Sequence, residues 1–326
     1  MFYVAVVMKI SVVIPLLNEE ESLAELAAQL EAALSACAPE SYEVLFIDDG
    51  STDNSFAVLR DLHRQNPRFR AVRFRRNYGK SAALAVGFAR AAGEIVITMD
   101  ADLQDDPREI PALLARLDEG YDLVSGWKKK RYDPWHKTMP SKLFNAVTSR
   151  ISGVKLHDFN CGLKAYRREV VASLNIYGDM HRYIPALAHW EGFRVTEIPV
   201  QHRPRQFGVS KFGAKRFITG FLDLLTVLFT TKYIKRPLHL FGTIGALMLI
   251  AGLGVEITLT AQWLLGTTYL SNRPLSLFGI LLIIVGVQLI SMGLLGEMLV
   301  KNFSAGVSQY LIREQTTDGD DFQKKI

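Results

Sequence analysis

The sequence predicts an α/β domain with a mostly parallel sheet and helices on both faces, followed by an amphipathic helix and a two-helix transmembrane hairpin. Two observations predict this class. Over residues 1–210, short apolar runs alternate with helical patterns, which is the order of a parallel sheet with right-handed crossovers. Later, residues 240–255 and 276–296 contain no charged side chain, which is typical of membrane spans.

The predicted strands are near-continuous apolar runs, as expected for parallel strands that are covered on both faces. They lie at residues 10–15, 42–49, 70–74, 94–100 and 121–126. The helical patterns between them lie at residues 20–36, 54–64, 80–92 and 107–119. In such sheets, ligands bind outside the carboxyl ends of the strands. The polar residues at those ends are therefore expected to line one crevice; they are Asn18, Glu19, Asp48, Asp49, Asp100 and Asp102.

Residues 211–236 show one narrow polar stripe on an otherwise apolar helix, with Asp223 in its middle. The aspartate argues against a span, so we expect a helix that lies in the membrane interface; a core helix of the soluble domain is the alternative. Within residues 237–300, the two spans are expected at 238–264 and 275–295. Cations gather on one side of this hairpin, which places both termini in the cytoplasm. The tail, residues 301–326, is expected to contain one short strand.

The net charge of +5 among 326 residues raises the question of a nucleic-acid partner. The basic residues cluster at 128–131 and just before the first span, which indicates anionic lipid head groups and no nucleic acid. Residues 128–130 are interpreted as a lipid-adhesion patch. The two cysteines imply no disulfide framework and suit a reducing compartment. The first ten residues lack a cationic segment and are not interpreted as a signal peptide.

Four aspartates, at positions 100, 102, 105 and 106, crowd the end of one predicted strand. Clustered carboxylates repel one another, so a cation is expected beside them. Asp100, Asp102 and Gln104 alternate, so in an extended backbone they point to one side and offer hard oxygen ligands for Mg²⁺ or Mn²⁺.

Asp48 and Asp49 end a second apolar strand, and a binding role is favoured for both because two adjacent carboxylates have no obvious structural purpose there. Residues 51–53 are interpreted as the cap of the next helix. Lys80 begins a helix, where it can meet a phosphate or remain a solvated helix terminus. It does not belong to a Walker loop, because Phe74 stands where that loop needs a glycine. The histidines show no metal-ligand spacing.

Six segments together resemble family 2 glycosyltransferases of the Rossmann-like GT-A fold, specifically those that glycosylate polyisoprenyl phosphates. The segments are VVIPLLNEEESL, FIDDGSTDNS, RNYGKSAAL, TMDADLQDDP, HDFNCGLKAYRREV and HRPRQFGVSKF. The resemblance implies transfer of a hexose from a nucleotide sugar, with UDP-glucose preferred over GDP-mannose, to undecaprenyl or dolichyl phosphate. It also implies an integral protein of the prokaryotic inner membrane, with residues 1–210 as a cytoplasmic catalytic domain. A homo-oligomer is expected, and a tetramer is the state that the resemblance suggests.

The resemblance also implies roles for particular residues. Pro15, Leu17, Glu19 and Asp49 correspond to the pocket for the base and ribose, with Asp48 and Lys80 added as donor-binding candidates. Asp100, Asp102 and Gln104 correspond to the metal site that holds the diphosphate. Asp158 corresponds to an acidic residue near the acceptor, with a structural ion pair to Arg167 or Arg168 as the alternative. Arg131, Ser141, Arg203 and Lys211 correspond to groups that hold the lipid phosphate, and Arg205 is a further cation available for it.

The chemistry of this reaction is compatible with these residues. A phosphate monoester has a second pKa near ~6, so the acceptor is largely a dianion and needs no strong general base. Direct attack on the anomeric carbon implies inversion. A processive polysaccharide synthase is the rival enzyme, but the chain has no Gln-X-X-Arg-Trp motif and too few spans. A non-catalytic membrane scaffold with a decayed domain would have lost Asp100 and Asp102, and both are present.

Overall fold

The computed structural model describes residues 9–38, 41–129, 145–203 and 237–303, apart from 147, 151, 179 and 268–273. The chain forms two units, whose described parts are residues 9–203 and 237–303. The predicted interfacial helix at 211–236, the tail strand and the N-terminal extension lie outside the described residues.

The first unit is built on a seven-stranded sheet in the order β3-β2-β1-β4-β6-β5-β7. The strands are β1 (Ile10–Leu16), β2 (Tyr42–Asp48), β3 (Phe69–Arg73), β4 (Ile95–Thr98), β5 (Leu123–Lys128), β6 (Lys164–Arg167) and β7 (Val195–Val200). Neighbouring strands pair in parallel, except that β6 is antiparallel to both β4 and β5. The mostly parallel α/β class predicted from the sequence is therefore confirmed.

Helices cover both faces of this sheet because side chains of each strand alternate between the faces. Ile10, Val12 and Ile14 of β1 pack in one core with α1 (Leu23–Cys37) and α4 (Ile110–Asp118). Val13 points to the other face, where Gly87 of α3 (Lys80–Arg90) lies directly over it. The remaining helices are α2 (Ser55–Gln65), α6 (Arg168–Ser173) and α7 (Ile184–Trp190), with short 3-10 turns η1 (Pro107–Glu109) and η2 (Met180–Arg182).

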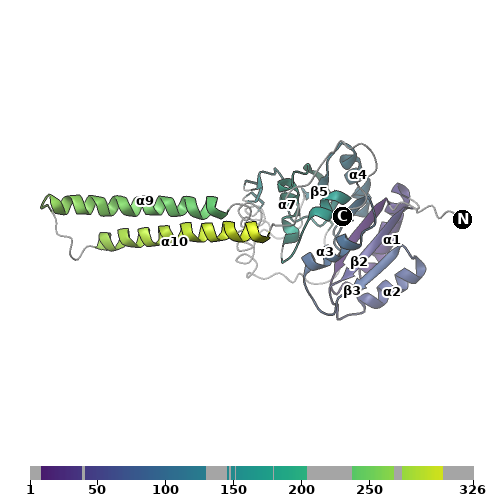
Figure 1. The fold of residues 1–326 in the computed structure, drawn as a ribbon. Helices are drawn as coiled ribbons and strands as arrows, with labels where there is room; N and C mark the ends of the chain where they lie inside the picture. The colour runs from purple at the N-terminus through teal and green to yellow at the C-terminus, as the bar shows by residue number, and fades with distance from the viewer. Residues whose placement is uncertain are drawn as a thin grey trace, which may run out of the picture. The chain divides into compact units, whose positions relative to one another are not determined.

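The second unit consists of two long helices, α9 (Pro237–Leu264) and α10 (Pro274–Phe303), which lie side by side (Figure 1). Their backbones meet at glycines: a Cβ on Gly245 would lie 2.6 Å from the carbonyl oxygen of Gly286, and a Cβ on Gly252 would lie 2.7 Å from that of Gly279. These pairs run in opposite directions along the two helices, so the helices form an antiparallel hairpin. Both are long and apolar enough to cross a membrane.

The structure adds elements that the apolar runs did not predict. These elements are β6, β7, α6 and α7, which all follow β5 in the sequence. In the sheet, β6 lies between β4 and β5, and β7 forms the edge beyond β5. β4 ends at Thr98, two residues before the predicted end, so Met99 and Asp100 belong to the following loop.

Candidate functional site

The loop formed by residues 100–106, which we call the acidic loop, follows β4 at the carboxyl edge of the sheet. Leu103 adopts a left-handed conformation, with φ of 60°. The carboxylate of Asp102 accepts a hydrogen bond from the backbone N–H of Gln104 at 3.2 Å, and Asp106 caps η1 by accepting from the N–H of Arg108 at 3.1 Å. Local hydrogen bonds of this kind are what aspartates offer in tight turns.

Protein cations accompany Asp100, Asp105 and Asp106. Lys80 pairs with Asp100, Lys128 pairs with Asp105 at 2.8 Å, and Arg108 pairs with Asp106 at 2.7 Å. The cations expected beside these carboxylates are therefore supplied at least in part by the protein's own side chains, and the crowding alone does not require a metal ion. The interpretation of Lys128 as part of a lipid-adhesion patch is wrong, because its side chain is only 13% exposed and faces Asp105.

Asp100 lines the cleft described below, whereas Asp106 of the same loop lines a second cavity together with Gln29 and Arg203. Burial raises the pKa of Asp100, but the ammonium groups of Lys80, Lys128 and Lys164 outweigh burial and lower the pKa to about 2. The carboxylate is therefore ionised at neutral pH. Gly162 lies against it, since a Cβ at that position would be 2.6 Å from the carboxylate.

The cleft has a cavity volume of about 20 Å³, and it opens where β1, β4 and β6 meet α3 and η2. Pro15, Lys80 and Asp100, all predicted as donor-binding residues, line it. The other lining residues were not predicted as site residues, and they include Asn160, Cys161, Lys164, Tyr166, His181 and Arg182. Leu17, Glu19, Asp48, Asp49, Asp102 and Asp158 are not among its lining residues.

Lys164 and His181 show how strongly this cleft favours negative charge. Lys164 is 4% exposed, its ammonium donates to the carbonyl of Cys161, and burial lowers its pKa. Burial, followed by the charges of Lys80 and Arg182, lowers the pKa of His181 to about 2, so the imidazole is neutral. Its Nδ1 and the hydroxyl of Ser81 form a hydrogen bond at 3.0 Å. Three cations, Lys80, Lys164 and Arg182, thus share the cleft with one carboxylate.

Asp48 and Asp49 have structural contacts that the sequence did not reveal. Asp48 accepts from the N–H of Ser51 at 2.7 Å and pairs with Arg73 at 3.3 Å. The two oxygens of Asp49 accept from the N–H groups of Tyr78 and Gly79, at 2.7 and 2.9 Å. The premise that these carboxylates lack a structural purpose is wrong, and their role in donor binding stays a prediction.

The loops after β1 and β2 are also joined to each other. The N–H of Glu19 donates to the hydroxyl of Ser55 at 2.9 Å, and the side-chain oxygen of Asn18 accepts from the N–H of Thr52 at 2.8 Å. Glu19, one of the residues predicted to bind the base and ribose, thus lies in a loop that is hydrogen-bonded to the loop after β2.

Asp158 is buried, 1% exposed, and accepts from the N–H of Asn160 at 3.0 Å. The alternative partners proposed from the sequence make other contacts: Arg167 donates to the carbonyl of Leu117, and Arg168 donates to that of Ala92. Next to Asp158, His157 stacks on Trp127 with ring centroids 4.1 Å apart.

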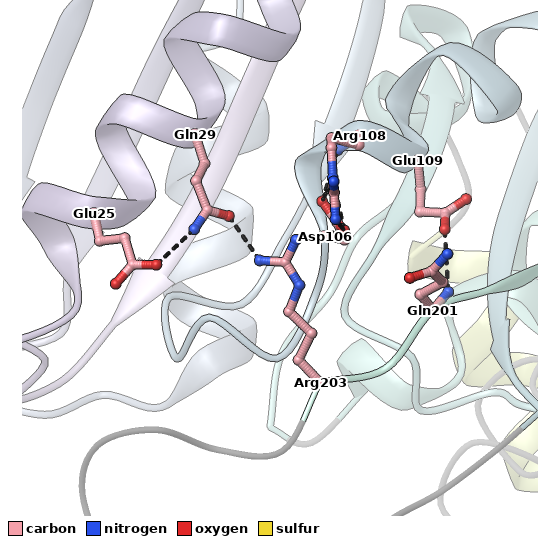
Figure 2. A network of polar contacts seen from close by, with 7 residues as sticks. All are labelled: Glu25, Gln29, Asp106, Arg108, Glu109, Gln201 and Arg203. Carbon is pink, nitrogen blue, oxygen red and sulfur yellow. Dashed lines mark hydrogen bonds and ion pairs between the residues drawn. The ribbon is translucent and has the colours of Figure 1, made fainter.

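Arg203, predicted to hold a lipid phosphate, lies in a different environment (Figure 2). Its guanidinium pairs with Asp106 and donates to the side-chain oxygen of Gln29 at 3.0 Å. Arg131, Ser141, Arg205 and Lys211, the other predicted phosphate ligands, lie outside the described residues.

The predicted metal ligands Asp100, Asp102 and Gln104 offer two carboxylates and one amide. Among the described residues, no group of three or more His, Cys, Asp or Glu side chains could hold a metal ion. The set nevertheless fits Mg²⁺ or Mn²⁺, which accept a few carboxylates and fill their remaining positions with water or substrate phosphates. The ionised Asp100, already in contact with the ammonium of Lys80, is the donor best suited to a cation.

Comparison with known proteins agrees with this architecture. The family model described as Glycosyl transferase family 2 matches residues 11–174. Glucosyl-3-phosphoglycerate synthase from Mycobacterium tuberculosis, in complex with Mn²⁺, uridine-diphosphate-glucose and phosphoglyceric acid, has a similar fold, with a TM-score of 0.53 and 21% identity over 67% of this chain and 80% of that one. Its complex with phosphoglyceric acid alone gives 0.51 and 22% over the same shares.

Proposed function

Since the chain belongs to glycosyl transferase family 2 and is a nucleotide-sugar transferase, we propose that it transfers a hexose to a polyisoprenyl phosphate at the cytoplasmic face of a prokaryotic inner membrane. The observation that carries the donor half of this proposal is the cleft beside Asp100. The observation that favours a lipid acceptor is the hairpin of α9 and α10, whose outer surface exposes large apolar side chains.

The charge of the cleft suits a nucleotide diphosphate. Three cations and one carboxylate leave an excess of positive charge in a cleft where Lys164 and Arg182 are buried, and electrostatic interactions of buried groups are stronger than in bulk solvent. The donor's diphosphate would compensate this excess, with Lys164 and Arg182 added to Lys80 as phosphate-binding groups. UDP-glucose is the preferred donor, supported by the uridine-diphosphate-glucose bound to the similar fold above, and GDP-mannose is second.

Asp100, Asp102 and Gln104 are proposed to hold Mg²⁺ or Mn²⁺, which supplies positive charge to the departing diphosphate. The ammonium of Lys80 would then turn from Asp100 to the phosphates. Pro15, Leu17, Glu19, Asp48 and Asp49 are proposed to bind the base and ribose. His181 lines the cleft with a polar imidazole, which burial keeps neutral, so its charge does not change near neutral pH.

The acceptor needs positioning more than deprotonation, since its phosphate is largely dianionic at neutral pH. Attack of this phosphate on the anomeric carbon breaks the bond to the nucleotide diphosphate and inverts the configuration. Asp158 is proposed to orient the sugar. Arg131, Ser141, Arg205 and Lys211 are proposed to bind the acceptor phosphate, and a homo-oligomer, with a tetramer as one form, remains part of the proposal.

A small phosphorylated acid is the second candidate acceptor, favoured by the phosphoglyceric acid bound to the similar fold. The full chain in detergent is incubated with Mn²⁺ and radiolabelled UDP-glucose or GDP-mannose, together with undecaprenyl phosphate, dolichyl phosphate or phosphoglyceric acid. Label in the organic phase that is lost with EDTA supports the proposal. Label only in water-soluble product refutes the lipid acceptor, and absence of product with every pair favours a non-catalytic scaffold.

A further inference from the structure

Residues 201–203, which we call the β7 strap, run along the acidic loop and its following turn. The backbone N–H of Arg203 donates to the carbonyl of Gln104 at 3.0 Å, and Asp105 and His202 form an antiparallel bridge. The N–H of Gln201 donates to the side chain of Glu109 at 3.2 Å. The strap therefore provides hydrogen-bond partners for backbone groups of the acidic loop, including the carbonyl of Gln104.

The side chain of Arg203 adds a cross-link that connects three separate elements (Figure 2). The guanidinium comes from the strap, pairs with Asp106 of the acidic loop, and donates to Gln29 of α1. Gln29 is oriented in turn by a hydrogen bond to Glu25 at 2.8 Å. The carboxylate of Asp106 is only 3% exposed and the side chain of Arg203 is 25% exposed, so this charge-assisted contact is partly shielded from solvent.

Arg108 contacts the same carboxylate but has a different structural effect. It follows Asp106 by two residues, and its side chain is 74% exposed. Its ion pair therefore neutralises Asp106 without joining the loop to another element. Arg203 is the residue that makes the connection, and its planar fork of donors suits two acceptors at once.

We propose that Arg203 is a positioning residue for the acidic loop, acting through the carboxylate of Asp106 and the carbonyl of Gln104, and not a ligand of the acceptor phosphate. The proposal rests on the proposed function, because the loop contains Asp100, Asp102 and Gln104. The contact at Gln104 fixes the backbone at one end of this set, while Asp106 is held just beyond it. Metal and diphosphate would then bind a loop that is already ordered.

The test compares Arg203→Met with Arg108→Met, which removes a cation from the same carboxylate but leaves the strap in place. Hydrogen exchange of residues 100–106 is measured first, in the full chain in detergent without metal. We expect exchange about tenfold faster in Arg203→Met and nearly unchanged in Arg108→Met, because only the first opens the cross-link. Calorimetric titration with UDP and Mn²⁺ then measures affinity, expected to fall about tenfold in Arg203→Met alone.

Equal exchange in Arg203→Met and the native chain would overturn the proposal. So would a raised acceptor KM with unchanged affinity for Mn²⁺ and UDP, which would return Arg203 to the acceptor phosphate. If the native chain binds no UDP, the proposed function fails, whereas the exchange experiment still decides the role of Arg203. If Arg203→Met does not fold, the same exchange experiment is made with Arg203→Lys and Gln29→Leu. Each variant is expected to raise the exchange rate of residues 100–106 by a smaller factor. An unchanged exchange rate in either variant would refute the proposal.

Discussion

Replacing Lys164 with methionine should weaken donor binding without weakening the fold. The side chain is buried in the cleft, and its ammonium donates a hydrogen bond to the carbonyl of Cys161. A hydrogen bond to a charged group contributes about 1.5–3 kcal/mol. Loss of one such bond to the diphosphate would weaken binding by roughly 10- to 100-fold, since each 1.4 kcal/mol is about tenfold.

The free energy of unfolding of Lys164→Met should be close to that of the native chain or slightly higher. Burial disfavours the charged form of Lys164, which is why its pKa is lowered. Methionine fills a similar volume, and replacing a buried ionic group with an apolar one is often neutral or stabilising. The lost bond to Cys161 offsets part of that gain, so we expect a free energy of unfolding within about 1 kcal/mol of the native value.

The pH dependence gives the same residue a second signature. Because the folded pKa lies below the ordinary value of 10.5, the unfolded chain binds more protons between the two pKa values, and stability rises with pH in that window. Donor binding should fall as pH passes through the folded pKa, since the cation is lost. Both slopes should be absent in Lys164→Met.

The assay is titration with UDP-glucose and Mn²⁺ over alkaline pH, together with thermal unfolding of the metal-free chain. Lys155→Met is the matched control, because Lys155 is exposed and does not line the cleft. Unchanged affinity in Lys164→Met, or an equal loss in Lys155→Met, would refute the assignment of the cleft to the diphosphate.

Three further substitutions test the loop and the hairpin. Asp102→Ala should abolish transfer, by at least about 100-fold, while membrane insertion remains intact; normal turnover in a labelled-sugar assay would contradict the metal assignment. Gly162→Ala should displace the Asp100 carboxylate, 2.6 Å from the added methyl carbon, and weaken Mn²⁺-dependent UDP binding in a calorimetric titration by about tenfold. Gly252→Val should separate α9 from α10 and lower the thermal unfolding temperature, whereas Gly254→Val, which has open space around it, should not; similar temperatures for the two variants would contradict the glycine contact.

The first five strands could be predicted because most of them are near-continuous apolar runs, and the hairpin because charged residues are absent from long stretches of its two segments. β6 gave a weaker signal, since it has four residues and includes Lys164 and Arg167 at its ends. β7 lies at the edge of the sheet, where five of its six residues are at least partly exposed. A pattern of apolar residues does not identify strands that are this short or that lie at the edge of a sheet.

The acidic loop could be recognised from four neighbouring aspartates, but their partners could not. Lys164 lies 64 residues beyond Asp100 in the numbering of the chain, and His181 lies 17 residues further on. Only the placement of β6 between β4 and β5 brings them to the same cleft. For Asp48 and Asp49, the acceptors were visible in the sequence, whereas their donors are mostly backbone N–H groups, which carry no residue signature. The remaining partner, Arg73 beside Asp48, lies on another strand.

The antiparallel direction of β6 explains how the acidic loop can be both rigid and available to a ligand. Because β6 begins beside the end of β4, the turn before it places Gly162 against Asp100 and Lys164 in the cleft. Asp105 and Asp106 face other elements, and breaking a buried ion pair costs about 3–5 kcal/mol, so these pairs should persist during the reaction. The pair between Lys80 and Asp100 is about one-third exposed on each side and can exchange partners at lower cost. The loop therefore combines fixed ion pairs at its base with one exchangeable pair in the cleft, at the position where a charged donor would enter.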